Sequence, residues 1–143
     1  ACDLSVAVQS AKFACSGVRL GVAPAVISVG CLDKMNVADG FDLLLTGERV
    51  SAARAKESGL LNKVVEDEAL DAAVATYVDQ LRRGGPKALA ATKQLLQRVR
   101  TMDRMEAFNW TAELSANLFA SEEAQAGMGA FLKREPAPWV PQD

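Results

Sequence analysis

Histidine is missing from all 143 residues, and its absence excludes several kinds of active site. A Ser-His-Asp triad, a Cys-His pair, a histidine general base and a His-ligated zinc ion cannot be built from this chain. Aromatic residues are scarce at 6%, which leaves few platforms for stacking nucleic-acid bases. Sixteen basic against eighteen acidic residues give a net charge of −2, so the chain lacks the basic surface that nucleic acid or an anionic membrane attracts.

Paired cysteines and long apolar runs are also missing. Cys2, Cys15 and Cys31 are odd in number and match no CxxC spacing, so we expect three free, buried thiols in a reducing cytoplasm and no metal site. The longest uncharged stretch, residues 20–32, is too short to span a bilayer. No signal-peptide pattern opens the chain, and the expected location is therefore cytoplasmic.

The residues that are present predict a folded α/β chain. Half of them are hydrophobic, enough for a packed core. Alternating apolar residues predict a strand over residues 1–8. The next strand-like segment is only residues 11–14, so the sheet is expected to be incomplete within this chain.

Capping residues predict a series of helices after these strands. Pro24 is expected in the first turn of a helix that reaches about Met35, and a short extended segment is expected over residues 60–65. The predicted N-terminal residues of the other helices are Asn36 (helix 37–45, ending near Gly47), Ser51 (ending at Gly59), Asp67, Pro86, Asp103 (reaching Phe119) and Ser121. Gly127 and Gly129 each cost a helix about 1 kcal/mol relative to alanine, which indicates close backbone approach by a helix or by a ligand, and we expect a helix.

The most specific local pattern is Val18-Arg-Leu-Gly-Val-Ala-Pro-Ala-Val-Ile-Ser28. It predicts the end of a strand, a turn at Gly21 and a helix whose free N–H groups can hold a carboxylate, a water or an oxyanion. An ordinary strand-to-helix turn explains the same spacing, and spacing alone favours it. No phosphate loop, dinucleotide fingerprint or nucleophile elbow occurs anywhere in the sequence.

Three linked motifs nevertheless resemble one family. Residues 2–32 run from Cys-Asp-Leu-Ser-Val-Ala to Val-Arg-Leu-Gly-Val-Ala-Pro-Ala, residues 45–60 read Leu-Thr-Gly-Glu-Arg-Val-Ser-Ala-Ala-Arg-Ala-Lys-Glu-Ser-Gly-Leu, and residues 127–134 are followed by Pro138-Trp139. In order and spacing they resemble the second half of the crotonase family, the enoyl-CoA hydratases and isomerases.

The resemblance implies an α/β, crotonase-like fold. Residues 1–35 would be the last part of a spiral of ββα units, and residues 36–143 a helical region that builds trimers or hexamers and completes the coenzyme A site. The family's N-terminal half would be missing, possibly as a separate polypeptide. That half carries most coenzyme A contacts, the oxyanion-hole N–H groups and the first catalytic glutamate.

The resemblance also implies acyl-CoA chemistry in which an oxyanion hole stabilises a thioester enolate, with coenzyme A as part of the substrate and no other cofactor. Gly17 stands where the hydratases carry their second catalytic glutamate. Ala25 stands where other members carry an acid, and only its backbone N–H remains to orient a water.

Five further positions carry over as binding residues. Leu20, Gly21 and Pro24 match the wall of the acyl pocket, whereas Phe131 and Arg134 match residues that contact the adenine and phosphate of coenzyme A. For Phe131, packing in a core or an interface explains its presence equally well, and Arg134 could be a solvated helix end.

Several functions stay open at this point. The protein could catalyse with one upstream glutamate, could use the oxyanion hole for another acyl-CoA reaction, or could be a non-catalytic protein for acyl-CoA binding or assembly. A free-standing helical interaction module would leave the opening strand unpaired.

Overall fold

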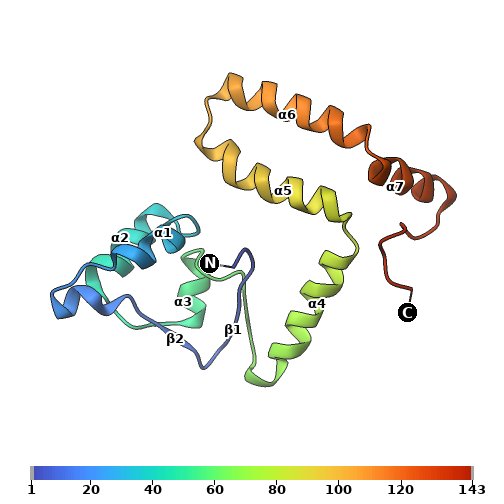
Figure 1. Cartoon of the computed structure of the whole chain (residues 1–143). Helices are drawn as coiled ribbons and strands as arrows, with labels where there is room; N and C mark the ends of the chain where they lie inside the picture. The colour runs from blue at the N-terminus through green and yellow to red at the C-terminus, as the bar shows by residue number, and fades with distance from the viewer. Residues whose placement is uncertain (1, 143) are drawn as a thin grey trace. The chain divides into compact units, whose positions relative to one another are not determined.

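The computed structural model describes residues 2–142, and the chain divides into two compact units, Ala1–Ala75 and Thr76–Asp143. The first unit holds short strands and short helices, and the second is helical (Figure 1). The boundary lies inside helix α4 (Leu70–Arg82). The sequence predicts a division at residue 35 between the ββα spiral and the helical region, and this division stays a prediction. Strands from both sides of residue 35 pair with each other within the first unit.

Two small sheets organise the first unit. Strand β1 (Val6–Val8) pairs in parallel with β4 (Lys63–Val65), in the register Val6 to Lys63. Strand β2 (Lys12–Phe13) pairs antiparallel with β3 (Val50–Ser51). The partner of β1 is thus not the next strand-like segment, residues 11–14, but lies within the extended segment predicted over residues 60–65, more than fifty residues further along the chain.

Most of the predicted helix ends are confirmed. The first unit contains α1 (Ala25–Leu32), α2 (Val37–Thr46) and α3 (Ala52–Glu57). Asn36 is the N-cap of α2, and Gly47 ends that helix in the left-handed conformation. Ser51 is the N-cap of α3, and its side chain accepts a hydrogen bond from the Arg54 N–H.

The buried core of the first unit is built from small side chains. Ala52 and Ala55 on α3 are fully buried and pack with Ala7 of β1 and Leu61. Ser58 is fully buried as well, and its hydroxyl donates to the Ala55 carbonyl oxygen at 2.8 Å. Alanines allow α3 to approach the strands closely, so the core tolerates little added volume.

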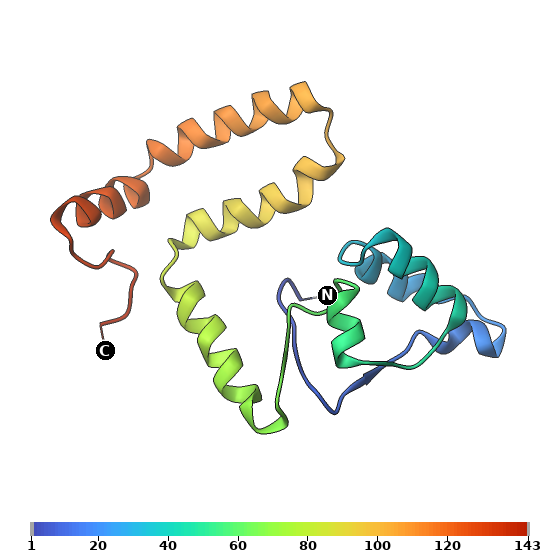
Figure 2. The ribbon, with the colours of Figure 1, turned by 180° about the vertical axis from the view of Figure 1, so that it is seen from behind.

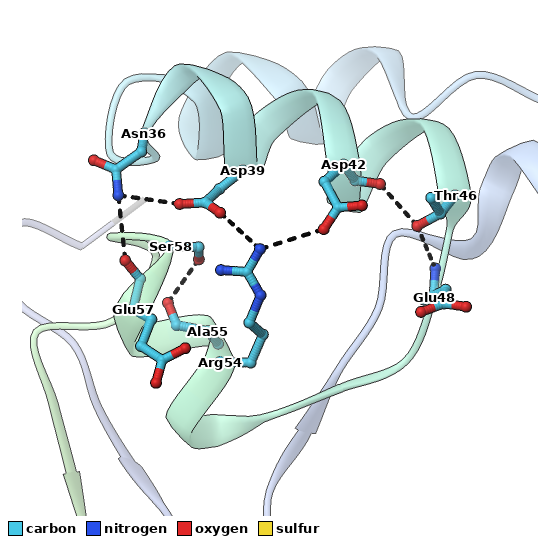
Figure 3. A network of polar contacts seen from close by, with 9 residues as sticks. All are labelled: Asn36, Asp39, Asp42, Thr46, Glu48, Arg54, Ala55, Glu57 and Ser58. Atoms are coloured by element: carbon cyan, nitrogen blue, oxygen red, sulfur yellow. Dashed lines mark hydrogen bonds and ion pairs between the residues drawn. The ribbon is translucent and has the colours of Figure 1, made fainter.

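A polar network ties α2 to α3 (Figure 3). One Arg54 nitrogen donates to Asp39 Oδ1 at 2.6 Å and to Asp42 Oδ2 at 3.3 Å. Asn36 donates both to Asp39 Oδ2 at 3.1 Å and to the Glu57 carbonyl oxygen at 3.2 Å. The hydrogen bond from Arg54, and then that from Asn36, lowers the pKa of Asp39 below its ordinary value.

Asp39→Asn is expected to lower the urea midpoint at neutral pH, because it removes the carboxylate that Arg54 bonds. A carboxyl with a lowered pKa stabilises the fold above its ordinary unfolded pKa and loses that contribution as pH falls through the folded value. The difference between native protein and variant should therefore vanish in acid. Urea titrations at several pH values check this, with Asp42→Asn as the control because its bond to Arg54 is longer. A difference that persists unchanged in acid contradicts the account.

The second unit consists of α5 (Pro86–Arg98), α6 (Arg104–Phe119) and α7 (Glu122–Lys133), preceded by the end of α4. Helices α5 and α6 form a hairpin, seen from both sides in Figures 1 and 2. Pro86, Asp103 and Ser121 begin these helices as the sequence predicts.

The turn between α4 and α5 is held from two sides. The Glu123 carboxylate accepts the N–H groups of Lys87 and Ala88, both at 3.0 Å, and so caps the N-terminus of α5. The Trp139 indole N–H donates to the Arg83 carbonyl oxygen at 3.0 Å. Two residues far along the chain therefore fix this one turn.

Gly127 is required by the Trp139 contact. A Cβ at Gly127 would lie 2.6 Å from Cη2 of the Trp139 ring, whereas a Cβ at Gly129 meets nothing within 4 Å. The neighbour of Gly127 is thus the C-terminal tail and not another helix, which corrects the sequence-based expectation. For Gly129 the described residues give no close approach at all.

These two glycines form a matched pair on one helix. Gly127→Ala should destabilise the protein by about 1–3 kcal/mol through overpacking against the indole, whereas Gly129→Ala should stabilise it by about 0.5–1 kcal/mol through helix propensity. Guanidinium unfolding followed by tryptophan fluorescence measures both. In a Trp139→Ala background Gly127→Ala should become neutral or stabilising, and persistent destabilisation there would refute the ring contact as its cause.

Candidate functional site

The segment that carries the predicted acyl site is a tight helical turn followed by α1. Residues Ser16–Leu20 form a 3-10 helix, η1, where the sequence analysis expected a strand end. Gly21 follows with φ +78°, in the left-handed region that glycine adopts without strain. The expected turn at Gly21 is thus confirmed, but it closes a helical turn and not a strand.

Gly17 lies half-buried on the inner side of this turn. Its carbonyl oxygen accepts the Val22 N–H at 3.1 Å, and a Cβ added at Gly17 would lie 2.9 Å from the Val22 carbonyl oxygen. A side chain here would therefore displace backbone. The position where the family's second glutamate is expected is closed by the chain itself, in addition to lacking a carboxylate.

Pro24 and Ala25 form a compact entry to α1. Pro24 is the N-cap, with φ −76° and ψ 53°, and the Ala25 N–H donates to the Ala23 carbonyl oxygen at 2.8 Å. These angles and this bond are those of an inverse γ-turn. Pro24 therefore precedes the helix instead of lying in its first turn, and the Ala25 N–H, predicted to orient a water, is engaged within the turn.

The free donors of α1 come one residue later. The first intrahelical bond runs from the Ser28 N–H to the Pro24 carbonyl oxygen at 3.1 Å. Val26 and Ile27 precede that bond, and N–H groups at such positions have no carbonyl partner inside their helix. These two N–H groups, which the sequence analysis did not single out, are the donors that α1 can offer to a ligand oxygen.

The predicted pocket wall faces outward in the described chain. Leu20 is 80% exposed and Val26 is 90% exposed, while Gly21 is exposed and Pro24 half-buried. Leu20, Gly21 and Pro24 line neither the apolar cavity beside Cys15 nor the one beside Phe108. The turn is therefore not filled by its own side chains, and it presents an apolar surface.

The Leu-Thr-Gly motif holds this turn in place. Thr46 Oγ1 donates to the Asp42 carbonyl oxygen at 2.7 Å and accepts the Glu48 N–H at 3.3 Å (Figure 3). Gly47 has φ +60°, and a Cβ on it would lie 2.9 Å from Val18 Cγ2. Arg19 Nε donates to the Thr46 carbonyl oxygen at 2.9 Å. The end of α2 is thus packed and bonded directly against η1.

An apolar cavity of about 160 Å³ lies beside the same turn. It is lined by Phe13, Ala14, Cys15, Ile27, Cys31, Met35, Leu43, Leu44, Glu48, Val50 and Leu60. Burial, and then the nearby Cys31 thiol, raises the pKa of Cys15. The raised pKa lowers the fraction of Cys15 thiolate at neutral pH.

The cysteines differ from one another in exposure. All three are free, as expected, but Cys2 is exposed and Cys15 and Cys31 are half-buried, so the expectation of three buried thiols is wrong. Among residues 2–142 no group of three or more metal-ligating side chains is placed to hold a metal ion. Within the same residues, no helix combines the length and the apolar character that a membrane crossing requires.

Phe131 and Arg134 lie at the end of α7 in the second unit. Phe131 is 81% exposed, which excludes core packing within the described chain. Arg134 is the C-cap of α7 and has φ +59°, and it alone among the described non-glycine residues has a positive φ. Such a conformation costs an L-residue about 1–2 kcal/mol, and glycine is its usual occupant.

Comparison with known proteins gives one consistent family. The family model described as "Enoyl-CoA hydratase/isomerase" matches residues 1–142. The enoyl-CoA hydratase EchA19 of Mycobacterium tuberculosis is 34% identical over 134 residues, which cover 92% of this chain and 50% of that protein. The chain thus spans about half the length of the curated relatives it matches.

Solved structures agree with the sequence match. A crystal structure of enoyl-CoA hydratase from Mycobacterium smegmatis has a TM-score of 0.90 and 32% identity, covering 98% of this chain and 55% of that one. An enoyl-CoA hydratase/isomerase from Marinobacter aquaeolei has a TM-score of 0.92 and 29% identity, covering 97% and 53%. The predicted α/β, crotonase-like fold is confirmed.

Gly47 and Gly21 allow a test of how η1 is held. Both have positive φ, but a Cβ at Gly21 meets nothing within 4 Å, whereas one at Gly47 also meets Ser16 Cα at 3.3 Å. Gly21→Ala should therefore cost only about 1–2 kcal/mol of left-handed strain. Gly47→Ala should cost more and should speed amide exchange in residues 16–20. Equal urea midpoints for the two variants would contradict the packing of α2 on η1.

Proposed function

Because the chain belongs to the enoyl-CoA hydratase/isomerase family, we propose that it supplies the C-terminal part of a protein that binds and transforms acyl-CoA thioesters. The observation that carries this proposal is the family match over residues 1–142, together with a TM-score of 0.90 to a solved hydratase. In this proposal the remaining part of the protein, which carries the oxyanion hole and the first catalytic glutamate, comes from residues outside this sequence.

This chain is proposed to contribute one wall of the acyl-CoA site and two backbone hydrogen-bond donors. The N–H groups of Val26 and Ile27 at the start of α1 can bond an oxygen of the thioester or an attacking water. Leu20, Gly21 and Pro24 lie on the adjoining apolar turn, where an acyl chain would be shielded from water. Neither Gly17 nor Ala25 can move a proton, so in this proposal proton transfer is assigned to other groups, the first catalytic glutamate among them.

The Gly17 contact supports a second candidate, a non-catalytic protein that binds acyl-CoA or serves assembly. A missing carboxylate alone could be restored by substitution, but the Val22 carbonyl oxygen lies where a Gly17 side chain would begin. A hydratase that relies on two glutamates would need this turn to open. The closed turn therefore favours either a single-glutamate enzyme, hydratase or isomerase, or binding without turnover.

Phe131 and Arg134 are proposed to contact coenzyme A, Phe131 through its exposed ring and Arg134 through its guanidinium, whose donor geometry suits a phosphate. The strained Arg134 backbone supports the proposal, because strain at a non-glycine residue often marks a functional position. No cofactor other than coenzyme A of the substrate is proposed.

A homo-oligomer, as a trimer or hexamer, is proposed for the second unit. Large apolar side chains on its helices are more than half exposed, and surfaces of this kind are usually covered by a partner. They are Leu96, Met105, Phe108, Phe119 and Leu132, in addition to Phe131. A location in the cytoplasm remains part of the proposal.

Crotonyl-CoA hydration, followed by loss of the conjugated thioester absorbance, separates the two candidates in the protein as its gene encodes it. Saturable hydration supports the enzyme, and calorimetric binding without turnover supports the non-catalytic protein. Gly17→Glu should not raise the rate and should lower stability about as much as Gly17→Ala, because the Cβ creates the conflict in both. If the protein neither binds nor turns over any acyl-CoA, both the enzyme and the acyl-CoA-binding protein are contradicted, and only the assembly role stands.

Arg134 is tested with coenzyme A and its 3′-dephospho analogue. Arg134→Gly should stabilise the fold by about 1 kcal/mol, because glycine relieves the positive φ, and should weaken coenzyme A binding by roughly tenfold, since a hydrogen bond to a charged group contributes about 1.5 kcal/mol or more. The affinity for the 3′-dephospho analogue should fall less than the affinity for coenzyme A. Lys133→Gln, which removes the neighbouring positive charge, is the matched control. Equal losses for both ligands in calorimetry would remove Arg134 from the phosphate site.

A further inference from the structure

Two of the three free thiols line one cavity. Cys15 is the N-cap of η1 and Cys31 lies in the last turn of α1, and both contribute to the apolar cavity of about 160 Å³. The Cys31 thiol also raises the pKa of Cys15, which requires the two sulfur atoms to lie within electrostatic range of each other. Cys2 is exposed and lines neither cavity.

The positions of these cysteines in the chain are informative. The residues between them, 16–30, include every residue proposed for the acyl site in the first unit: Gly17, Leu20, Gly21, Pro24, Ala25, Val26 and Ile27. A bond between Cys15 and Cys31 would therefore enclose the whole acyl-site segment in one covalent loop and tie the start of η1 to the end of α1.

We propose that Cys15 and Cys31 form a redox-sensitive pair whose disulfide closes residues 16–30 into a loop and rigidifies the acyl-site segment. The effect on acyl-CoA binding rests on the proposed function, whereas the bond itself does not. The apolar cavity favours a disulfide over a metal bound by two thiolates, because two neutral thiols become one neutral disulfide and no charge is buried.

The oxidant is a low-molecular-weight disulfide such as oxidised glutathione. The thiolate of one cysteine attacks a sulfur of the oxidant, forming a mixed disulfide and releasing one glutathione thiolate. The second cysteine thiolate then attacks the protein-bound sulfur and releases the other glutathione. The two protons pass to the released thiolates, so the protein loses two electrons and the oxidant gains them. Because burial raises the pKa of Cys15, the reaction should accelerate as pH increases.

The bond can be tested in the native chain, because trypsin separates the three cysteines. Cleavage after Lys12, Arg19 and Lys34 leaves Cys15 in residues 13–19, Cys31 in residues 20–34 and Cys2 in the peptide that ends at Lys12. After equilibration with oxidised and reduced glutathione, mass spectrometry should find peptides 13–19 and 20–34 joined, while Cys2 carries glutathione or stays reduced. Glutathione on Cys15 and Cys31 separately, or a bond to Cys2, would overturn the proposal.

Rigidification is measured by hydrogen–deuterium exchange on the oxidised and reduced protein. Amides of residues 16–30 should exchange at least severalfold more slowly in the oxidised form, with residues 86–98 of α5 in the second unit as the internal control. The Cys2→Ser variant should behave in the same way, and Cys2→Ser/Cys31→Ser should show no redox effect. If the disulfide forms but exchange in residues 16–30 is unchanged, the proposed rigidification is wrong.

The crotonyl-CoA measurements separate this proposal from the proposed function. If the disulfide forms and slows exchange but no acyl-CoA binds, the pair is established and the acyl-CoA function fails. If acyl-CoA binds equally in both redox states despite the disulfide, the regulatory role fails and the proposed function stands.

Discussion

The contact between the end of α2 and the η1 turn is the constraint on which the rest of the first unit depends. Gly47 adopts a left-handed conformation that brings its Cα against Val18. The Arg19 side chain donates a hydrogen bond to the Thr46 carbonyl oxygen. With η1 fixed in this way, the chain turns at Gly21, tightens at Pro24 and delivers the start of α1. The position and direction of the donors at Val26 and Ile27 follow from that one contact.

Several glycines of this chain lie so close to a neighbouring group that a larger residue would not fit. At these positions the glycine is required by the fold, whatever side chain the family's chemistry would call for. Gly17 lacks a carboxylate, but the Val22 carbonyl oxygen also excludes a side chain there, so its glycine is part of how the turn closes. Gly127 serves the indole of Trp139 in the same way, and Gly85 lies under the Glu123 carboxylate. Trp139 thus holds the α4–α5 turn through its bond to the Arg83 carbonyl oxygen, a contact that only the folded chain shows.

Local signals predicted local structure well. Asn36, Ser51, Asp103 and Ser121 were found at helix N-termini because a cap depends on a few adjacent residues. The strand pairs could not be predicted, because β1 and β4 are more than fifty residues apart in the sequence. Strands of three residues are also too short to show a clear alternation of apolar and polar residues. The site was predictable to the same extent. The turn at Gly21 follows from the glycine itself. The hydrogen bond from the Ala25 N–H to the Ala23 carbonyl oxygen, and the position of the Val22 carbonyl oxygen at Gly17, depend on backbone angles that the sequence does not reveal. The family resemblance supplied the crotonase-like fold, which periodicity could not.

Amide exchange with and without an acyl-CoA ligand tests the central claim most directly, that the start of α1 and its preceding turn form a wall of a thioester site. In the protein as its gene encodes it, saturating acetyl-CoA should slow exchange in residues 20–28 and leave residues 86–98 of α5 unchanged. Protection that is absent from residues 20–28 while acetyl-CoA is demonstrably bound would place the thioester elsewhere and contradict the account.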